Sequence, residues 1–333
     1  MEPGPDKSRT PELSPLERLV AARQAEKLTQ RKRDNRVLAV VAAVVLVLAG
    51  GGAFAFVRLA PRSWLHHSAR AAPSVRVTPT PRSLSTSGPA LTGAAASPFL
   101  GSPAQSWADG AAGISVPAAR EHGPYTAAQV RSALETTRRL LIAGNLDWPT
   151  LRGGTPTAFA DLLTSQERQE FLSGLHTTAL NHDGSERNTR TWVSSFAPGT
   201  QFVTTVIKVS GTMSASTATD SGSEVLRITV NFLFAYAVEP AGNPADWMRI
   251  VQHRYGYVDF ARWDDPGGVL EPWYSVAGQT GGALCGVRDG YLHPDYPHGP
   301  PPSVQASGSP VNPYSLATPS ALSGYGCHAT TGT

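Results

Sequence analysis

The chain has 333 residues, a formal net charge of +3 and a pI near 8.9. Its excess of basic residues lies near the N-terminus, since after residue 121 there are thirteen Lys or Arg against seventeen Asp or Glu. The high pI is therefore no sign of a nucleic-acid-binding domain, and we expect no nucleic-acid partner.

Residues 1–36 form a basic segment, which we expect to be a cytoplasmic tail. The run Ser14-Pro15-Leu16-Glu17 predicts the start of a short amphipathic helix, with a Ser cap, a Pro in the first turn and a Glu three residues after the cap. Such a helix suits docking to a cytoplasmic partner or to an anionic lipid surface. The alternative is a charged lead-in that only fixes membrane orientation.

Residues 37–57 are 21 residues without a charge, enough to cross a bilayer core of about 30 Å as a helix. The denser positive charge on the N-terminal side predicts a single-pass protein of the cell membrane, with a cytoplasmic N-terminus and an extracytoplasmic C-terminal domain. A cleaved leader ending near Ala53-Phe54-Ala55 is the alternative.

The next segment, 58–123, is rich in Pro, Ala, Ser and Thr and poor in large apolar residues. Such a composition cannot bury enough apolar surface to order itself, so we expect a disordered stalk. Residues 124–296 are then the extracytoplasmic domain, and 297–333 a Pro-rich tail.

Helical signals open this domain. Thr126 and Gln129 form a predicted capping box, followed by apolar residues at helical spacing up to Gly144-Asn145. Two shorter helices are expected after Thr155 and Thr164. The first would bury Phe159, Leu162 and Leu163, and the second Phe171, Leu172 and Leu175.

From Thr191 the period of the apolar residues changes to two. We expect strands over 191–196, 201–210, 224–239 and 247–263, with a turn at Asp220-Ser221-Gly222. The two long strands imply a curved sheet or a bulge, for instance near Gly256. The resulting fold class is α+β, with one long and two short helices packed on a curved antiparallel sheet.

The order of helix 125–143, the turn Leu146-Asp147-Trp148, segment 163–175 and the strands resembles the NTF2-like (cystatin-like) folds. More narrowly, it is similar to the extracytoplasmic domains of single-pass actinobacterial membrane proteins. The resemblance covers about 125–263 and implies scaffolding rather than catalysis.

Cys285 and Cys327 are the only cysteines, and both lie on the predicted outer side. We expect a disulfide that fastens the Pro-rich tail to the domain. Two free thiols are the alternative.

Two groups of residues carry potential chemistry. His293, Asp295 and His298 match no established metal spacing, so we expect solvated loop residues and no metal or cofactor. His253, Tyr255, Tyr257 and Asp259 share one strand face by parity and form a candidate pocket, where catalysis would need a desolvated acid or base. The plainer interpretation is an ordinary sheet face.

The sequence thus favours a membrane-anchored, non-catalytic envelope protein whose outer domain binds other envelope proteins or itself. The alternative is a module that binds a small ligand or lipid between helix and sheet, and an enzyme is a third hypothesis. An open apolar cavity would favour ligand binding, a filled one scaffolding, and exposed strand edges self-association.

Overall fold

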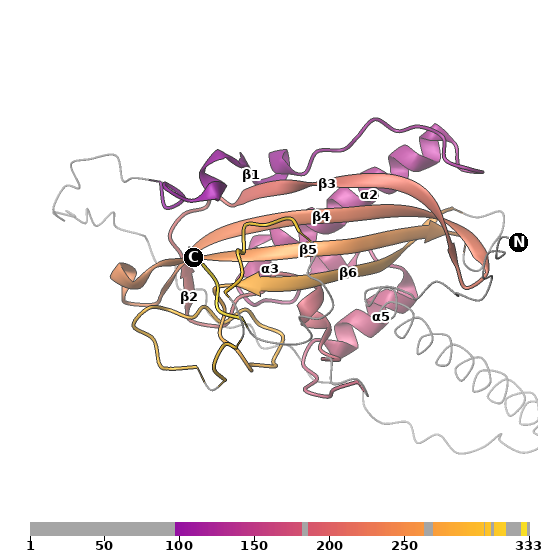
Figure 1. Cartoon of the computed structure of the whole chain (residues 1–333). Coiled ribbons are helices and arrows are strands. Elements are labelled where there is room, and N and C mark those ends of the chain that lie inside the picture. Colours follow the sequence, from indigo (N-terminus) through magenta and orange to yellow (C-terminus); the bar gives the residue numbers. More distant parts are fainter. Residues whose placement is uncertain are drawn as a thin grey trace, which may run out of the picture. The chain divides into compact units, whose positions relative to one another are not determined.

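The computed structural model describes residues 97–331, apart from 182–185, 263–268, 303, 308–309 and 318–327. These residues belong to one compact unit, 96–333. Its main element is an antiparallel sheet in the order β1-β3-β4-β5-β6, with β2 paired to the end of β4 (Figure 1). The strands are β1 Ala108–Asp109, β2 Thr200–Phe202, β3 Lys208–Asp220, β4 Ser223–Pro240, β5 Met248–Ala261 and β6 Glu271–Gly281.

The hairpin between β3 and β4 shows how local sequence sets the register. Ser221 and Gly222 both have positive φ, 50° and 84°, as a two-residue turn that matches strand twist requires. Asp220 therefore faces Ser223, and the pairing continues without a break to Lys208 opposite Ala235. The turn predicted from the sequence is confirmed.

One long helix, α2 (Ala127–Asn145), packs on the sheet. Its capping box is present as predicted, since Thr126 Oγ1 accepts from the Gln129 N–H and the Gln129 side chain accepts from the Thr126 N–H at 2.9 Å. The remaining helices are short: α3 Trp148–Leu151, α4 Thr157–Ala160 and α5 Ser165–Gly174, with 3-10 turns η1 Pro103–Ser106, η2 Gly110–Gly113, η3 Thr189–Trp192 and η4 Pro244–Asp246.

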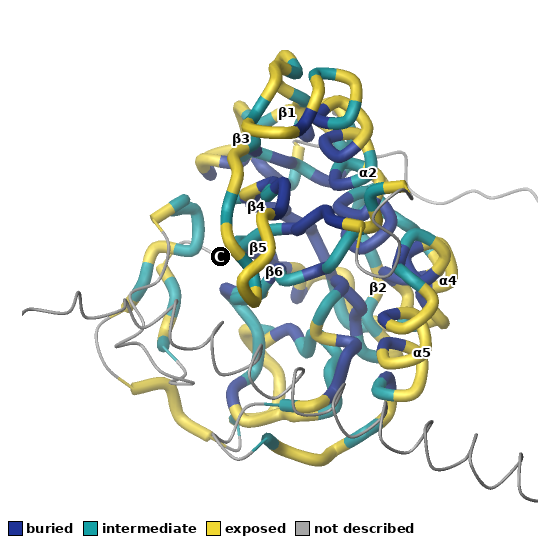
Figure 2. The backbone as a smooth tube through the Cα atoms, turned by 90° about the vertical axis from the view of Figure 1, so that its right-hand side faces the viewer, coloured by how far each residue is buried: buried dark blue, intermediate teal, exposed yellow. Residues whose placement is uncertain are grey.

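The main core lies between the helices and the inner face of the sheet, where buried segments of both gather (Figure 2). Aromatic side chains fill much of it. Phe159 contacts Phe171 with ring centroids 5.0 Å apart and meets Tyr274 edge-on at 5.1 Å. Six large side chains here are at most 3% exposed: Phe159, Phe171, Phe232, Phe234, Tyr236 and Tyr274.

A second, smaller core covers one end of the outer face. Leu233, Ala235 and Val251 pack there against Phe99 from the N-terminal segment and Tyr314 from the tail. This explains why the outward face of β4 becomes apolar along its length.

The expected fold class is wrong. The described residues form a mostly antiparallel sheet of six strands with few helices. The physical reason is that four long strands pair along almost their whole length, while every described helix except α2 has ten residues or fewer.

The expectation of a single-pass membrane protein is likewise not supported. Within the described part of the chain, no helix is long and apolar enough to cross a membrane. The segments on which that expectation rested, the tail 1–36 and the span 37–57, lie outside the described residues.

The ordered unit begins before its predicted boundary. Residues 97–123, expected to be part of the stalk, carry β1, η1 and η2, and three of their apolar side chains are buried: Phe99, Ala104 and Ile114. A few apolar residues are enough to give this segment a defined structure, because each packs into a core that other elements form. Cys285 is buried and is not a free thiol, whereas Cys327 lies outside the described residues, so their pairing is not described.

Gly256 marks a close approach rather than the predicted bulge. It pairs in unbroken register with Val230 on one side and Val276 on the other. Its φ is +135°, and a Cβ there would lie closer than 3.0 Å to the Ser275 carbonyl oxygen.

We expect Gly256→Ala to lower the free energy of unfolding by an amount near the top of the usual range of about 0.5–3 kcal/mol. Chemical denaturation measures this loss. Gly242→Ala is the matched control, because Gly242 also has positive φ but has no atom near its Cβ position, so its loss should be smaller. Equal losses would show that the close approach does not matter.

Candidate functional site

The four residues of the predicted pocket do share one face of β5, but that face is the outer one. Arg254, their alternate neighbour, reaches α2 by donating to the Asn145 side chain. Since successive side chains of a strand point to opposite faces, His253, Tyr255, Tyr257 and Asp259 point away from α2. They therefore lie on the face opposite the helices.

Asp259 is held by Arg227 from β4. The Arg227 Nε and Nη2 groups donate to the two carboxylate oxygens at 2.8 and 2.7 Å, and the guanidinium lies 3.6 Å above the centre of the Tyr257 ring. Asp259 is 1% exposed, and burial raises its pKa while the bonds from Arg227 oppose that rise. Both oxygens of the Asp259 carboxylate are therefore used in a bidentate ion pair with Arg227.

His253 is held in a similar way. Its Nε2 lies 2.6 Å from Asn231 Oδ1, and the Asn231 amide nitrogen donates to the Leu316 carbonyl. The Asn231 oxygen is thus an acceptor, so Nε2 carries the ring proton. Burial lowers the pKa of His253 to about 4, which keeps the ring neutral at ordinary pH.

On the inner face, a cavity of about 120 Å³ lies where β5 and β6 meet η3 and the loop 287–292. The strands contribute Gln252 and Arg254 from β5 and Gly278 and Thr280 from β6, so none of the four predicted pocket residues lines it. The Thr280 hydroxyl donates to the side-chain oxygen Oε1 of Gln252. Gln252 and Arg254 were not predicted because they alternate along β5 with the four residues that were selected. Gly278 and Thr280 lie on β6, which was not predicted as a strand.

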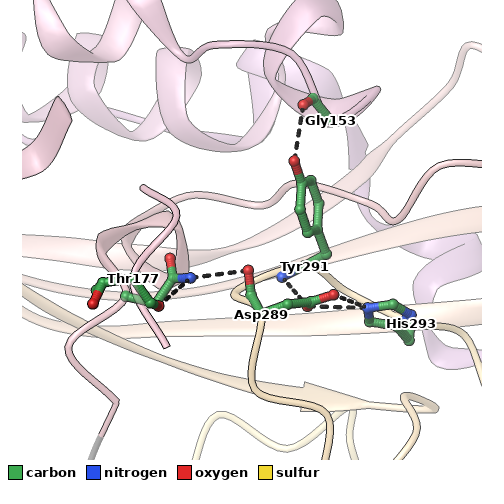
Figure 3. Close-up of polar contacts among 6 residues, drawn as sticks. Gly153, Thr177, Asp289, Tyr291 and His293 are labelled. Carbon is green, nitrogen blue, oxygen red and sulfur yellow. Dashed lines mark hydrogen bonds and ion pairs between the residues drawn. The ribbon is translucent and has the colours of Figure 1, made fainter. Parts of the chain in front are cut away.

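The loop that closes this cavity is fixed by its own polar contacts (Figure 3). The Asp289 carboxylate accepts from the Tyr291 N–H at 3.0 Å and from His293 Nε2 at 2.9 Å. The Tyr291 hydroxyl reaches the Gly153 carbonyl at 3.4 Å, and Asn188 donates to the Asp289 carbonyl. These hydrogen bonds hold the loop in a fixed conformation on one side of the cavity.

The two histidines of the segment 293–298 do not converge. His293 pairs with Asp289, whereas His298 Nδ1 lies 2.8 Å from the buried carboxylate of Asp246. Within the described ranges, no cluster of three or more His, Cys, Asp or Glu side chains has the arrangement of a metal site.

The two edges of the sheet differ sharply. On β6, Pro272 has no N–H, and the Tyr274 N–H donates to the buried Glu167 carboxylate at 2.8 Å. On β3, β1 pairs only with Lys208 and Val209. From Ser210 to Asp220, none of the described backbone groups hydrogen-bonds to the side of β3 away from β4.

The orientation of the β3 backbone follows from one bond. The Ile207 carbonyl accepts from the Gly110 N–H, on the side away from β4. Because peptide groups alternate in direction along a strand, every second residue from Val209 on points its N–H and C=O to the same side. Beyond the part of β3 that pairs with β1, five residues point their N–H and C=O groups away from β4. They are Gly211, Met213, Ala215, Thr217 and Thr219.

The β3 edge also lacks protective side chains. Natural edge strands are shielded by charges, Pro or bulges, but residues 209–219 contain only Val, Ser, Gly, Thr, Met and Ala. Several of them are exposed, including Thr212, Ser214, Ser216 and Thr217, whereas Met213 is buried. This uncharged run of small and β-branched residues was a sequence signal for the edge strand. Our prediction ended the strand at Ser210 and so missed most of it.

Comparison with known proteins finds no matching family model, no similar curated protein and no similar solved structure. The resemblance drawn from the sequence therefore stays untested.

Proposed function

We propose that the described domain is a non-catalytic binding module that self-associates by pairing β3 with β3 of a second copy. The observation that carries the proposal is the uncharged β3 edge from Gly211 to Thr219, whose outward backbone groups have no hydrogen-bond partner among the described residues. On β6, by contrast, Pro272 has no N–H and the Tyr274 N–H is already bonded to Glu167. Strand addition to an open edge is a general mode of protein recognition.

A second copy suits this edge for two reasons. In antiparallel pairing about a two-fold axis through Ala215, outward residue 211 faces 219 and 213 faces 217, so the same set of groups is matched on both copies. No charged side chain lies between 209 and 219, so self-pairing brings no like charges together.

The filled core favours binding of a protein over binding of a lipid. The aromatic side chains between α2 and the sheet are almost fully buried, and the cavity beside them is lined partly by polar groups. A lipid or drug-sized ligand needs a largely apolar pocket of about 300–1,000 Å³.

The test is a pair of proline substitutions in the full chain. Thr217→Pro removes an N–H that points outward, so the sheet should keep its stability while the dimer is lost. Sedimentation velocity over a concentration series should show a concentration-dependent dimer for the unmodified protein and a monomer for this variant.

Ser216→Pro is the control one residue away. The Ser216 N–H faces β4, so its loss leaves a backbone acceptor on β4 unpaired and should cost about 1–3 kcal/mol in unfolding free energy. If Thr217→Pro destabilises the fold as much as Ser216→Pro, or leaves the dimer intact, the assigned edge is wrong. A monomeric unmodified protein would reject self-pairing altogether.

A further inference from the structure

One buried guanidinium group lines the inner cavity without forming an ion pair with a described acidic residue. Arg254 is 1% exposed, and its acceptors, the Asn145 side chain, the Thr191 carbonyl and the Ser194 hydroxyl, are all neutral. Buried charges are costly unless paired, so this arrangement favours an anionic group from elsewhere.

Arg254 and Gln252 present nitrogen atoms at one place in the cavity. A Cβ on Gly278 would lie closer than 3.0 Å to both Arg254 Nη1 and Gln252 Nε2. The absence of a side chain at Gly278 is what lets these two donors reach the strand. A carboxylate has two acceptor oxygens and suits such a pair of donors.

The cavity also has an acidic wall. Glu186 lines it together with Arg254, and the two are not among the ion pairs of the described residues. Burial raises the pKa of Glu186, and the nearby Arg288 guanidinium opposes that rise, as a bound ammonium group would. The cavity thus offers donors for a carboxylate and, separately, an acceptor for an ammonium group.

The cavity is small, about 120 Å³, and therefore suits a ligand of a few heavy atoms. We infer that the cavity binds a small zwitterion, an amino acid of the size of glycine or alanine, with its carboxylate at Arg254 and Gln252 and its ammonium at Glu186.

Titration calorimetry on the full chain tests this inference, in a buffer without amines or carboxylates. Glycine and L-alanine should bind at one saturable site per chain. Acetate and methylammonium each supply only one charge and should bind at least about tenfold more weakly.

Three variants locate the site. Gly278→Ala places a methyl group between the two donors and should abolish binding, while Gln252→Leu removes one donor and should weaken it about tenfold. Ala277→Ser, on the opposite face of the same strand, should change nothing. Equal binding by Gly278→Ala and the unmodified chain, no heat with either amino acid, or equal affinity for acetate and alanine would each overturn the inference.

Discussion

Replacing Arg227 by Leu should lower the free energy of unfolding by about 3–5 kcal/mol, because it leaves the Asp259 carboxylate buried without a partner. Asp259 is 1% exposed, and both of its oxygens accept from Arg227. Urea unfolding at neutral pH, followed by circular dichroism, measures the loss.

The double variant Arg227→Leu/Asp259→Leu is the control that separates a lost attraction from a stranded charge. Replacing both members of a buried ion pair by apolar residues is often neutral, so the double variant should regain most of the lost stability. If it is as unstable as the single variant, the ion pair itself stabilises the fold and the unpaired Asp259 carboxylate is not the cause of the loss.

His253 should make stability fall as the pH is lowered. The ring is buried and its pKa falls from 6.5 to about 4 on folding, so below pH 6.5 the unfolded chain binds a proton that the folded chain does not. Stability is therefore fully present above pH 6.5, is lost as the pH falls toward 4, and levels off below that. The total loss is about 3 kcal/mol at about 1.4 kcal/mol per pH unit.

His253→Gln isolates this effect from other titrating groups. Glutamine keeps a donor for the Asn231 oxygen but does not titrate, so the difference in unfolding free energy between the two proteins should change by about 3 kcal/mol between pH 7 and pH 4. A difference that does not depend on pH would mean that His253 is solvated in the folded state.

Helix α2 and strands β4 and β5 were predictable because their signals are local and long. The capping box at Thr126 and the apolar spacing after it set α2, and alternation over 224–239 and 247–263 set the strands within one or two residues. Such signals depend on the chain's own geometry rather than on its neighbours.

Other elements depend on packing that a linear pattern does not show. The segment 191–196 was predicted as a strand, but residues up to Trp192 form η3, where Arg190 is buried against the backbone of Gly153 and Gly154. Strand β6 carried little alternation and was not predicted. Leu172, expected in the core, is 36% exposed because the buried side of α5 is formed by Glu167 and Phe171.

The prediction of the candidate site was limited in the same way, because a sequence pattern does not show how elements pack. Parity correctly placed His253, Tyr255, Tyr257 and Asp259 on one face, but parity does not say which face meets the helix. That depends on where α2 lies, and the contact from Arg254 to Asn145 settles it.

The most direct test of self-association through β3 is amide hydrogen exchange at single residues, measured at high and low protein concentration. The N–H groups of Gly211, Met213, Ala215, Thr217 and Thr219 point away from β4, so they should exchange fast in the dilute monomer and slowly in the dimer. The alternate amides, such as those of Ser214 and Ser216, should be protected at both concentrations because they bond to β4. Fast exchange of the outward amides at every concentration would contradict pairing at this edge.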